Sequence, residues 1–123
     1  MDAPKIPPHS VLIESARKTV KIELEAVAAL SDRIDESFAR ACEIILKSTG
    51  RVVVIGMGKS GHVGRKIAAT LASTGTTAMF VHPAEASHGD IGMIAANDVV
   101  LALSNSGSTE EILGLLPILH RKA

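Results

Sequence analysis

The sequence predicts an α/β protein with a doubly wound parallel sheet, preceded by two N-terminal helices. Beyond residue 50, short apolar runs alternate with segments of helical periodicity. This alternation is typical of a parallel sheet with helices on both faces. The run RVVVIG at 51–56 is continuously apolar from Val52, as in a strand covered on both sides. Within 9–49, apolar residues recur at spacings of three and four, which indicates helices.

The first of these helices is expected over 10–30. Ser31 or Asp32 should cap the second, and Gly50 should end it as a left-handed residue. Its buried side is expected to carry Ile34, Phe38, Ala41, Ile45 and Leu46. Residues 1–8 hold three of the five prolines and are expected to form a loose tail.

Three strands and two more helices follow in the prediction. A helix over 61–75 should end at Gly75, and its inward residues should be Ile67, Ala68, Leu71 and Ala72. The segments TAMFVH and NDVVLALSNSG each hold a strand, and a last helix begins near Thr109 with Pro117 kinking or shortening it. A doubly wound sheet usually has about five strands. We therefore expect this chain to be the front part of a truncated domain.

Composition argues against nucleic acid and membrane partners. Thirteen basic residues balance thirteen acidic ones, and there is no Trp or Tyr for base stacking. No apolar run approaches the roughly 18 residues of a membrane span, and no signal peptide is recognisable. We expect a cytoplasmic protein. Cys42 is the only cysteine, which excludes an internal disulfide, and its apolar helical context predicts a small core residue.

The first strand runs into a glycine-rich loop, VVVIGMGKSGHVG, which fits G-x-G-x-x-G. A nucleotide-triphosphate loop is excluded because its first glycine would fall at Val53. A dinucleotide loop needs an acid at the end of the second strand, where His82 and Pro83 stand instead. A smaller anion fits better, because the start of the following helix presents free N–H groups and Lys59 adds a positive charge.

A second polar loop follows the third strand. Ser104, Asn105, Ser106, Gly107, Ser108 and Thr109 form a hydroxyl-rich turn into a helix. Hydroxyls and helix N–H groups together can cradle a phosphate. Because both loops follow parallel strands, they should face the same crevice at the carboxyl ends of the sheet.

The motifs GMGKSG, HPAEASHGDIGM and SNSGSTEEI together resemble the D-arabinose-5-phosphate isomerase branch of the sugar isomerase (SIS) family. The resemblance implies a flavodoxin-like fold, with 9–123 as the N-terminal part of one SIS domain: a helical lead-in at 9–49 and a core at 50–123. It implies interconversion of D-ribulose 5-phosphate and D-arabinose 5-phosphate through an enediol, in the synthesis of 3-deoxy-D-manno-octulosonate for lipopolysaccharide. No cofactor is expected. The family draws a second catalytic glutamate and a histidine from a later segment.

The resemblance also assigns roles to residues. It implies that Lys59, His88 and Glu111 are catalytic, with His88 supplied by a neighbouring subunit. Substrate and its phosphate would be held by Gly58, Ser60, Ser104, Asn105, Ser106, Gly107, Ser108 and Thr109. Two alternatives remain open: Ser108 and Glu111 fit a capping box, and His88 fits a loop histidine bonded to backbone.

Further alternatives concern metal, function and assembly. His82, Glu85, His88 and Asp90 lie close enough in sequence to suggest metal ligands in a flexible loop, yet the reaction needs none, and no metal is predicted. A sugar-phosphate-sensing SIS module, or another isomerase such as a hexulose-phosphate isomerase, is the alternative function. The resemblance implies a homotetramer, a dimer of dimers, whose subunits share active sites. The wide apolar faces of the N-terminal helices also favour an oligomer.

Overall fold

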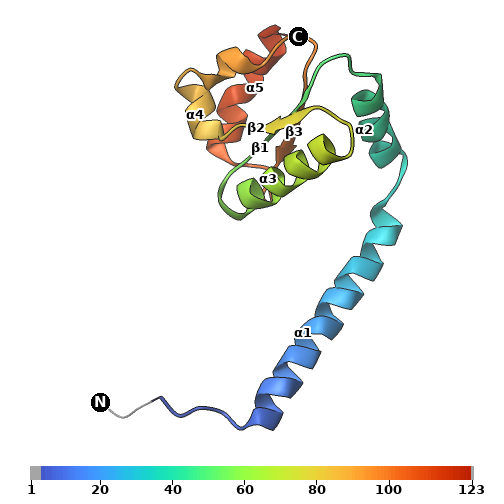
Figure 1. Ribbon diagram of the computed structural model, residues 1–123, viewed down its shortest axis with the longest axis vertical. Helices are drawn as coiled ribbons and strands as arrows, with labels where there is room; N and C mark the ends of the chain where they lie inside the picture. Colours follow the sequence, from blue (N-terminus) through green and yellow to red (C-terminus); the bar gives the residue numbers. More distant parts are fainter. Residues whose placement is uncertain (1–3, 123) are drawn as a thin grey trace. The chain divides into compact units, whose positions relative to one another are not determined.

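The computed structural model describes residues 4–122 and has a three-stranded parallel sheet with helices on both sides (Figure 1). The chain divides into two compact units, one ending at Ala41 and one beginning at Cys42. The predicted tail falls partly on residues 1–3, which lie outside the described residues, and its residues 4–8 have no regular structure.

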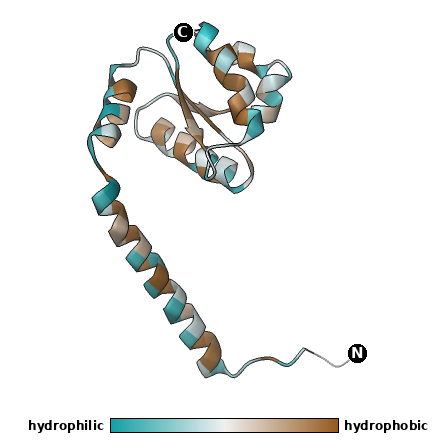
Figure 2. Ribbon diagram, turned by 180° about the vertical axis from the view of Figure 1, so that it is seen from behind, coloured by the Kyte–Doolittle hydropathy of each residue, from teal (hydrophilic) through white to brown (hydrophobic). Residues whose placement is uncertain are grey.

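The first unit is helical. It contains α1 (His9–Leu30), the 3-10 turn η1 (Ser31–Arg33) and the first half of α2 (Glu36–Lys47). Apolar residues recur along α1, as Figure 2 shows, and none of its side chains is buried. Val20 and Leu24 are 68% and 66% exposed. The helix predicted over 10–30 is therefore confirmed, and its apolar face stands open within its own unit.

The predicted start and end of the second helix are wrong. Ser31 belongs to η1, and the cap of α2 is Asp35, whose Oδ1 accepts hydrogen bonds from the N–H of Ser37 (3.0 Å) and from its hydroxyl. These bonds lower the pKa of Asp35. Gly50 is not left-handed. It is required because a Cβ there would lie 2.2 Å from the carbonyl oxygen of Asn97.

The predicted buried side of this helix is also mostly wrong. Ile45 is half-buried against the core of the second unit, whereas Phe38 is 56% and Leu46 83% exposed. Ile34 lies before the helix begins. Cys42, predicted to be a small core residue, is half-buried and belongs to neither core of the described residues.

The sheet is built around its first strand. The strands are β1 (Val52–Gly56), β2 (Ala78–Phe80) and β3 (Val99–Leu103), in the spatial order β2-β1-β3, and both pairings are parallel. All five residues of β1 are buried. A central strand with helices on both faces has no solvent side, which explains its uninterrupted apolar sequence.

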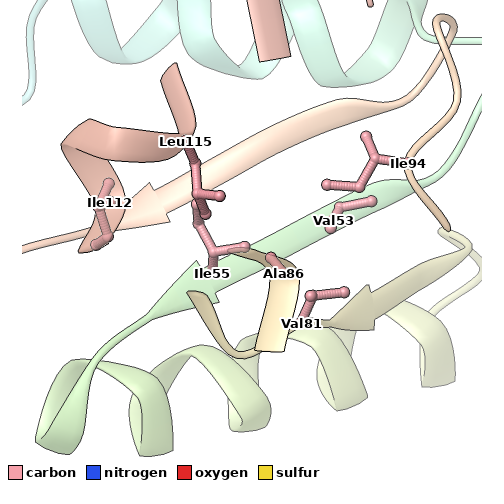
Figure 3. Packing of buried hydrophobic residues seen from close by; sticks show 7 residues of the cluster. All are labelled: Val53, Ile55, Val81, Ala86, Ile94, Ile112 and Leu115. Carbon is pink, nitrogen blue, oxygen red and sulfur yellow. The ribbon is translucent and has the colours of Figure 1, made fainter. Parts of the chain in front are cut away.

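Alternate residues of β1 build two separate cores. Val53 and Ile55 pack with residues of α4 (Pro83–Ser87) and α5 (Glu110–Lys122), including Ala86, Ile112 and Leu115 (Figure 3). Val52 and Val54 face the opposite side, where Ala68 of α3 (Gly58–Ser73) is buried with them. The predicted doubly wound α/β fold is confirmed.

Several local predictions differ from the structure. The helix predicted over 61–75 is α3 and begins three residues earlier, at Gly58; Ala72 on it is exposed. Gly75 takes the left-handed conformation after the end of α3, with φ +100°.

Pro117 lies inside α5 and does not shorten it, since the helix continues to Lys122. The segment HPAEASHGDIGM is not a flexible loop: it forms α4 and the 3-10 turn η2 (Asp90–Met93). Among the described residues, no helix is long and apolar enough to cross a membrane.

A buried carboxylate joins the beginnings of β1 and β3. The Asp98 side chain is 2% exposed and accepts hydrogen bonds from the backbone N–H of Arg51 (2.7 Å), from its Nη2 (3.0 Å) and from the N–H of Ala95 (2.9 Å). The same guanidinium donates to the carbonyl of Met93 (2.6 Å). The pKa of Asp98 is lowered to about 2, and the hydrogen bond from the Arg51 side chain is the main cause.

The glycine loop depends on close packing between α3 and the end of β1. A Cβ on Gly61 would lie 2.6 Å from the carbonyl oxygen of Gly56, and one on Gly64 would lie 3.1 Å from Val54 Cγ1. Gly58 has φ +54°, a left-handed conformation that favours glycine. The spaced glycines therefore let the helix start directly above the strand.

We expect Gly61→Ala to lower the free energy of unfolding by roughly 1–3 kcal/mol, because the added methyl group must push α3 away from backbone that cannot yield. Chemical denaturation measures this change. Gly114→Ala in α5 is the matched control, since nothing lies within 4 Å of its Cβ position. It should be neutral or stabilise by up to about 1 kcal/mol through helix propensity. Equal effects of the two substitutions would contradict this account.

We expect Asp98 to stabilise the fold in a pH-dependent way. Its folded pKa lies below the unfolded value, so its contribution is complete above about pH 4 and is lost as the pH falls towards 2. Between those values the wild type should lose on the order of 2 kcal/mol more stability than Asp98→Asn. Urea unfolding at several pH values measures the difference. Glu43→Gln, which removes the exposed ion pair with Lys47, is the control. Its free energy of unfolding should fall with pH as that of the wild type does.

Candidate active site

The two polar loops predicted from the sequence meet at one hollow of about 460 Å³. It lies at the carboxyl ends of β1 and β3. From β1 the chain passes to β2 on one side and later to β3 on the other, so the strand order reverses at this point. Open α/β sheets bind their ligands at such a reversal. The lining residues are Lys59, Ser60, Val63, Ala102, Leu103, Ser104 and Asn105.

Lys59 brings positive charge to this hollow from the first turn of α3. Its side chain is exposed, and the ion pairs found within residues 4–122 involve Lys47 and Arg51 instead. No carboxylate is among the described residues that line the hollow. The helix dipole of α3 adds to the charge of Lys59, so the site favours a negatively charged ligand.

The serine turn is held in shape by its own hydroxyls. Ser104 Oγ accepts a hydrogen bond from the N–H of Gly107 (3.0 Å) and shares one with Thr109 Oγ1 (2.8 Å). Ser106 Oγ accepts from the N–H of Ser108 (3.2 Å). Gly107 has φ +69°, which explains a glycine at this point of the turn. Two of the backbone N–H groups predicted to hold phosphate are thus occupied, while the Ser106 hydroxyl keeps its own proton to donate.

The predicted capping box of Ser108 and Glu111 is wrong. Among the described residues, Ser108 makes its hydrogen bond to Ser106, and Thr109 supplies the first carbonyl of the helix, which accepts from Ile112 (3.1 Å) and Leu113 (2.9 Å). Glu111 is exposed in the first turn of α5. Its carboxylate is therefore free of a capping role, although it does not line the hollow.

His88 and Gly58 lie apart from the hollow. His88 is exposed at the end of α4, where its backbone N–H donates to the carbonyl of Glu85 (3.0 Å). Gly58 lines a different, smaller hollow. The structure thus brings together Lys59, Ser60, Ser104 and Asn105, with Ser106–Thr109 in the adjoining turn.

The four residues considered as metal ligands do not form one cluster in the described part of the chain. Within 4–122, no three His, Cys, Asp or Glu side chains are grouped so that they could hold a metal ion. His82, the first of the four residues considered, has another role. Its Nδ1 accepts from the N–H of Ala84 (3.2 Å) and caps α4.

Sequence reasoning missed part of the site. Val63, Ala102 and Leu103 form its apolar wall, and no polar motif marks them. Val63 could have been found from its position one helical turn after Lys59 and Ser60. The cap at His82 could have been found from the proline that follows it, since proline favours the first turn of a helix.

These features define a class of protein. The chain belongs to the SIS domain family, whose model matches residues 44–123. It is similar to the arabinose 5-phosphate isomerase KdsD of Pseudomonas aeruginosa, with 66% identity over 109 residues, covering 89% of this chain and 33% of the relative. The KdsD of Yersinia pestis is 59% identical over 109 residues, with the same coverage of both chains. The chain thus spans about a third of the length of these relatives.

Solved structures support the same fold. A protein of E. coli CFT073 in complex with arabinose 5-phosphate aligns with a TM-score of 0.90 at 45% identity, covering 95% of this chain and 62% of its own. A protein of Listeria monocytogenes aligns with a TM-score of 0.90 at 27% identity and the same coverage.

Proposed function

We propose that the protein to which this chain belongs is an aldose–ketose isomerase that interconverts D-ribulose 5-phosphate and D-arabinose 5-phosphate. One observation carries the proposal: Lys59 of the glycine loop and the start of the serine turn line a single hollow at the strand-order reversal. A cation on one side of the hollow and the hydroxyl of Ser104 on the other support the binding of a phosphorylated ligand. The similarity to arabinose 5-phosphate isomerases and to a structure in complex with arabinose 5-phosphate supports this substrate.

The proposed chemistry follows from these positions. Isomerisation moves a proton between C1 and C2 through an enediol, which needs a base, an acid and positive charge near the developing oxyanion. The hydroxyls of Ser104, Ser106 and Thr109 hold the phosphate. Lys59 stabilises the enediolate, and Glu111, which no cap restrains, exchanges the proton.

The proposed assembly completes the site. His88 lies outside the hollow of its own chain, so we place it in the site of a neighbouring subunit, within a cytoplasmic homotetramer arranged as a dimer of dimers. The boundaries of the SIS domain, with a lead-in at 9–49 and a core at 50–123, form part of this proposal, as does a role in making 3-deoxy-D-manno-octulosonate for lipopolysaccharide.

Incubation of the full-length protein with ketose phosphates tests the function. Ribulose 5-phosphate should yield arabinose 5-phosphate, which chromatographic separation of the sugars detects. Preferential turnover of a hexulose phosphate would reassign the protein to another SIS isomerase. Binding of sugar phosphate without any turnover would favour the regulatory module.

We expect Ser106→Ala to raise KM by about tenfold and to change kcat less. A hydrogen bond to a charged phosphate contributes roughly 1.5 kcal/mol or more, and it is made in the ground state and the transition state alike. Steady-state kinetics separates the two constants. Ser73→Ala, at the far end of α3, is the control and should leave both unchanged. A fall in kcat with unaltered KM would place the phosphate elsewhere.

We expect Lys59→Ala and His88→Ala each to lower kcat at least tenfold. A tenfold fall corresponds to the loss of about 1.4 kcal/mol of transition-state stabilisation. Mixing the two impaired variants should restore part of the activity, because some sites then receive an intact lysine from one chain and an intact histidine from another. Activity is assayed after subunit exchange has been verified. No recovery would place both residues in the site of one subunit, and an active monomer in light scattering would rule out the shared site.

A further inference from the structure

A second hollow lies on the other side of the start of α3. It has a volume of about 120 Å³ and is lined by Gly58, Gly61, His62, Arg65, Phe80 and His82. None of these residues lines the hollow between β1 and β3, which takes Lys59, Ser60 and Val63 from the same two turns of α3. The helix thus presents polar residues to two separate hollows, and the proposed isomerase reaction uses one of them.

All the ionisable side chains that line the second hollow are basic. His62 and Arg65 come from α3, and His82 precedes α4. No carboxylate is among the described lining residues. Within the part of the chain that the structure describes, the ion pairs are Lys47–Glu43 and Arg51–Asp98, so Arg65 has no carboxylate partner there. Its positive charge is therefore available to a ligand.

Two of the three basic side chains are held in place. The Arg65 guanidinium carbon lies 4.3 Å from the centre of the Phe80 ring, a cation–π contact that keeps the planar group beside the hollow. His82 Nδ1 accepts a hydrogen bond from the N–H of Ala84 (3.2 Å). The neutral ring consequently carries its proton on Nε2, which leaves that nitrogen as a donor.

The backbone and the size of the hollow also favour an anion. Gly58 adds no side chain, and nothing lies within 4 Å of its Cβ position, so a ligand can approach the start of the 16-residue helix α3, where the helix dipole is positive. A volume of 120 Å³ corresponds to about four water molecules in the liquid. This leaves room for one phosphate group.

We propose that this hollow is a second oxyanion site, which binds a phosphate group through Arg65, His62 and His82. The site is separate from the serine turn that holds the substrate phosphate in the proposed isomerase. It goes beyond that function and does not depend on it, because it rests on the charge, contacts and volume of a hollow that the reaction leaves unused.

Equilibrium dialysis of the full-length protein with labelled inorganic phosphate tests the site. The wild type should bind phosphate at the serine turn and, in addition, at the second hollow. Arg65→Gln should weaken the second class of binding by about tenfold or more and leave the first unchanged. Lys66→Gln is the matched control, since it removes an exposed cation next in sequence that lines neither hollow.

A second variant guards against an effect on folding. Arg65→Gln also removes the contact with Phe80, so its thermal stability is measured in parallel. His62→Gln removes an exposed side chain and should weaken the same class of binding without lowering the melting temperature. The proposal is overturned if the two variants bind phosphate as the wild type does, or if Ser106→Ala alone abolishes all phosphate binding.

The source of the phosphate group is decided by comparing a pentose monophosphate with a pentose bisphosphate. If the group belongs to a larger ligand, the bisphosphate should bind about tenfold tighter, and Arg65→Gln should remove that gain. If the two sugars bind with equal affinity and inorganic phosphate still binds at the second hollow, the site is one for free phosphate. Either result supports an oxyanion site, and absence of the second class from the wild type refutes it.

Discussion

The close approach of α3 to the end of β1 is the constraint on which the rest of this structure depends. Gly61 lies so near the carbonyl of Gly56 that no side chain fits between them, and Gly64 lets the helix pass over Val54 and Phe80. This contact fixes where the helix begins. It therefore fixes where the backbone of Lys59 and the N–H groups of the first turn lie. The same packing explains how a loop can fit a dinucleotide pattern while its glycines serve helix–strand packing.

The positions of the two hollows follow from that contact and from the strand order. Because β1 is central, a loop at its end has a neighbour on each side: β3 with the serine turn and β2 with His82. The start of α3 thus lies between two hollows that favour anions and differ in their lining residues. The surface towards β3 combines a single lysine with hydroxyls, whereas the surface towards β2 combines an arginine with two histidines.

The strand beginnings are held by a different interaction. Asp98 and Arg51 are at the opposite end of the sheet from the site, where a buried carboxylate satisfies the N–H groups of Arg51 and Ala95 and pairs with a guanidinium. Such a pair aligns β1 with β3 and leaves the carboxyl ends free for loops. The contacts of Asp98 thus lie at the end of β1 and β3 that is away from the polar loops.

The sequence by itself determined the fold class, the three strands and the two polar loops. The reason is local: an uninterrupted apolar strand, glycines at a strand–helix junction and a run of hydroxyl residues each restrict the backbone over a few residues. Only the tertiary structure decided which residues meet. Gly50 is needed for the approach of Asn97, a residue distant in sequence, rather than for a left-handed turn. Two other differences are local rather than tertiary: Asp35 replaced Ser31 as a cap because a 3-10 turn intervened, and the N–H of Ser108 donates to Ser106 Oγ, so no capping box with Glu111 forms. His62, Arg65 and His82 form one hollow because parallel pairing brings β2 beside β1, and no local pattern records that contact.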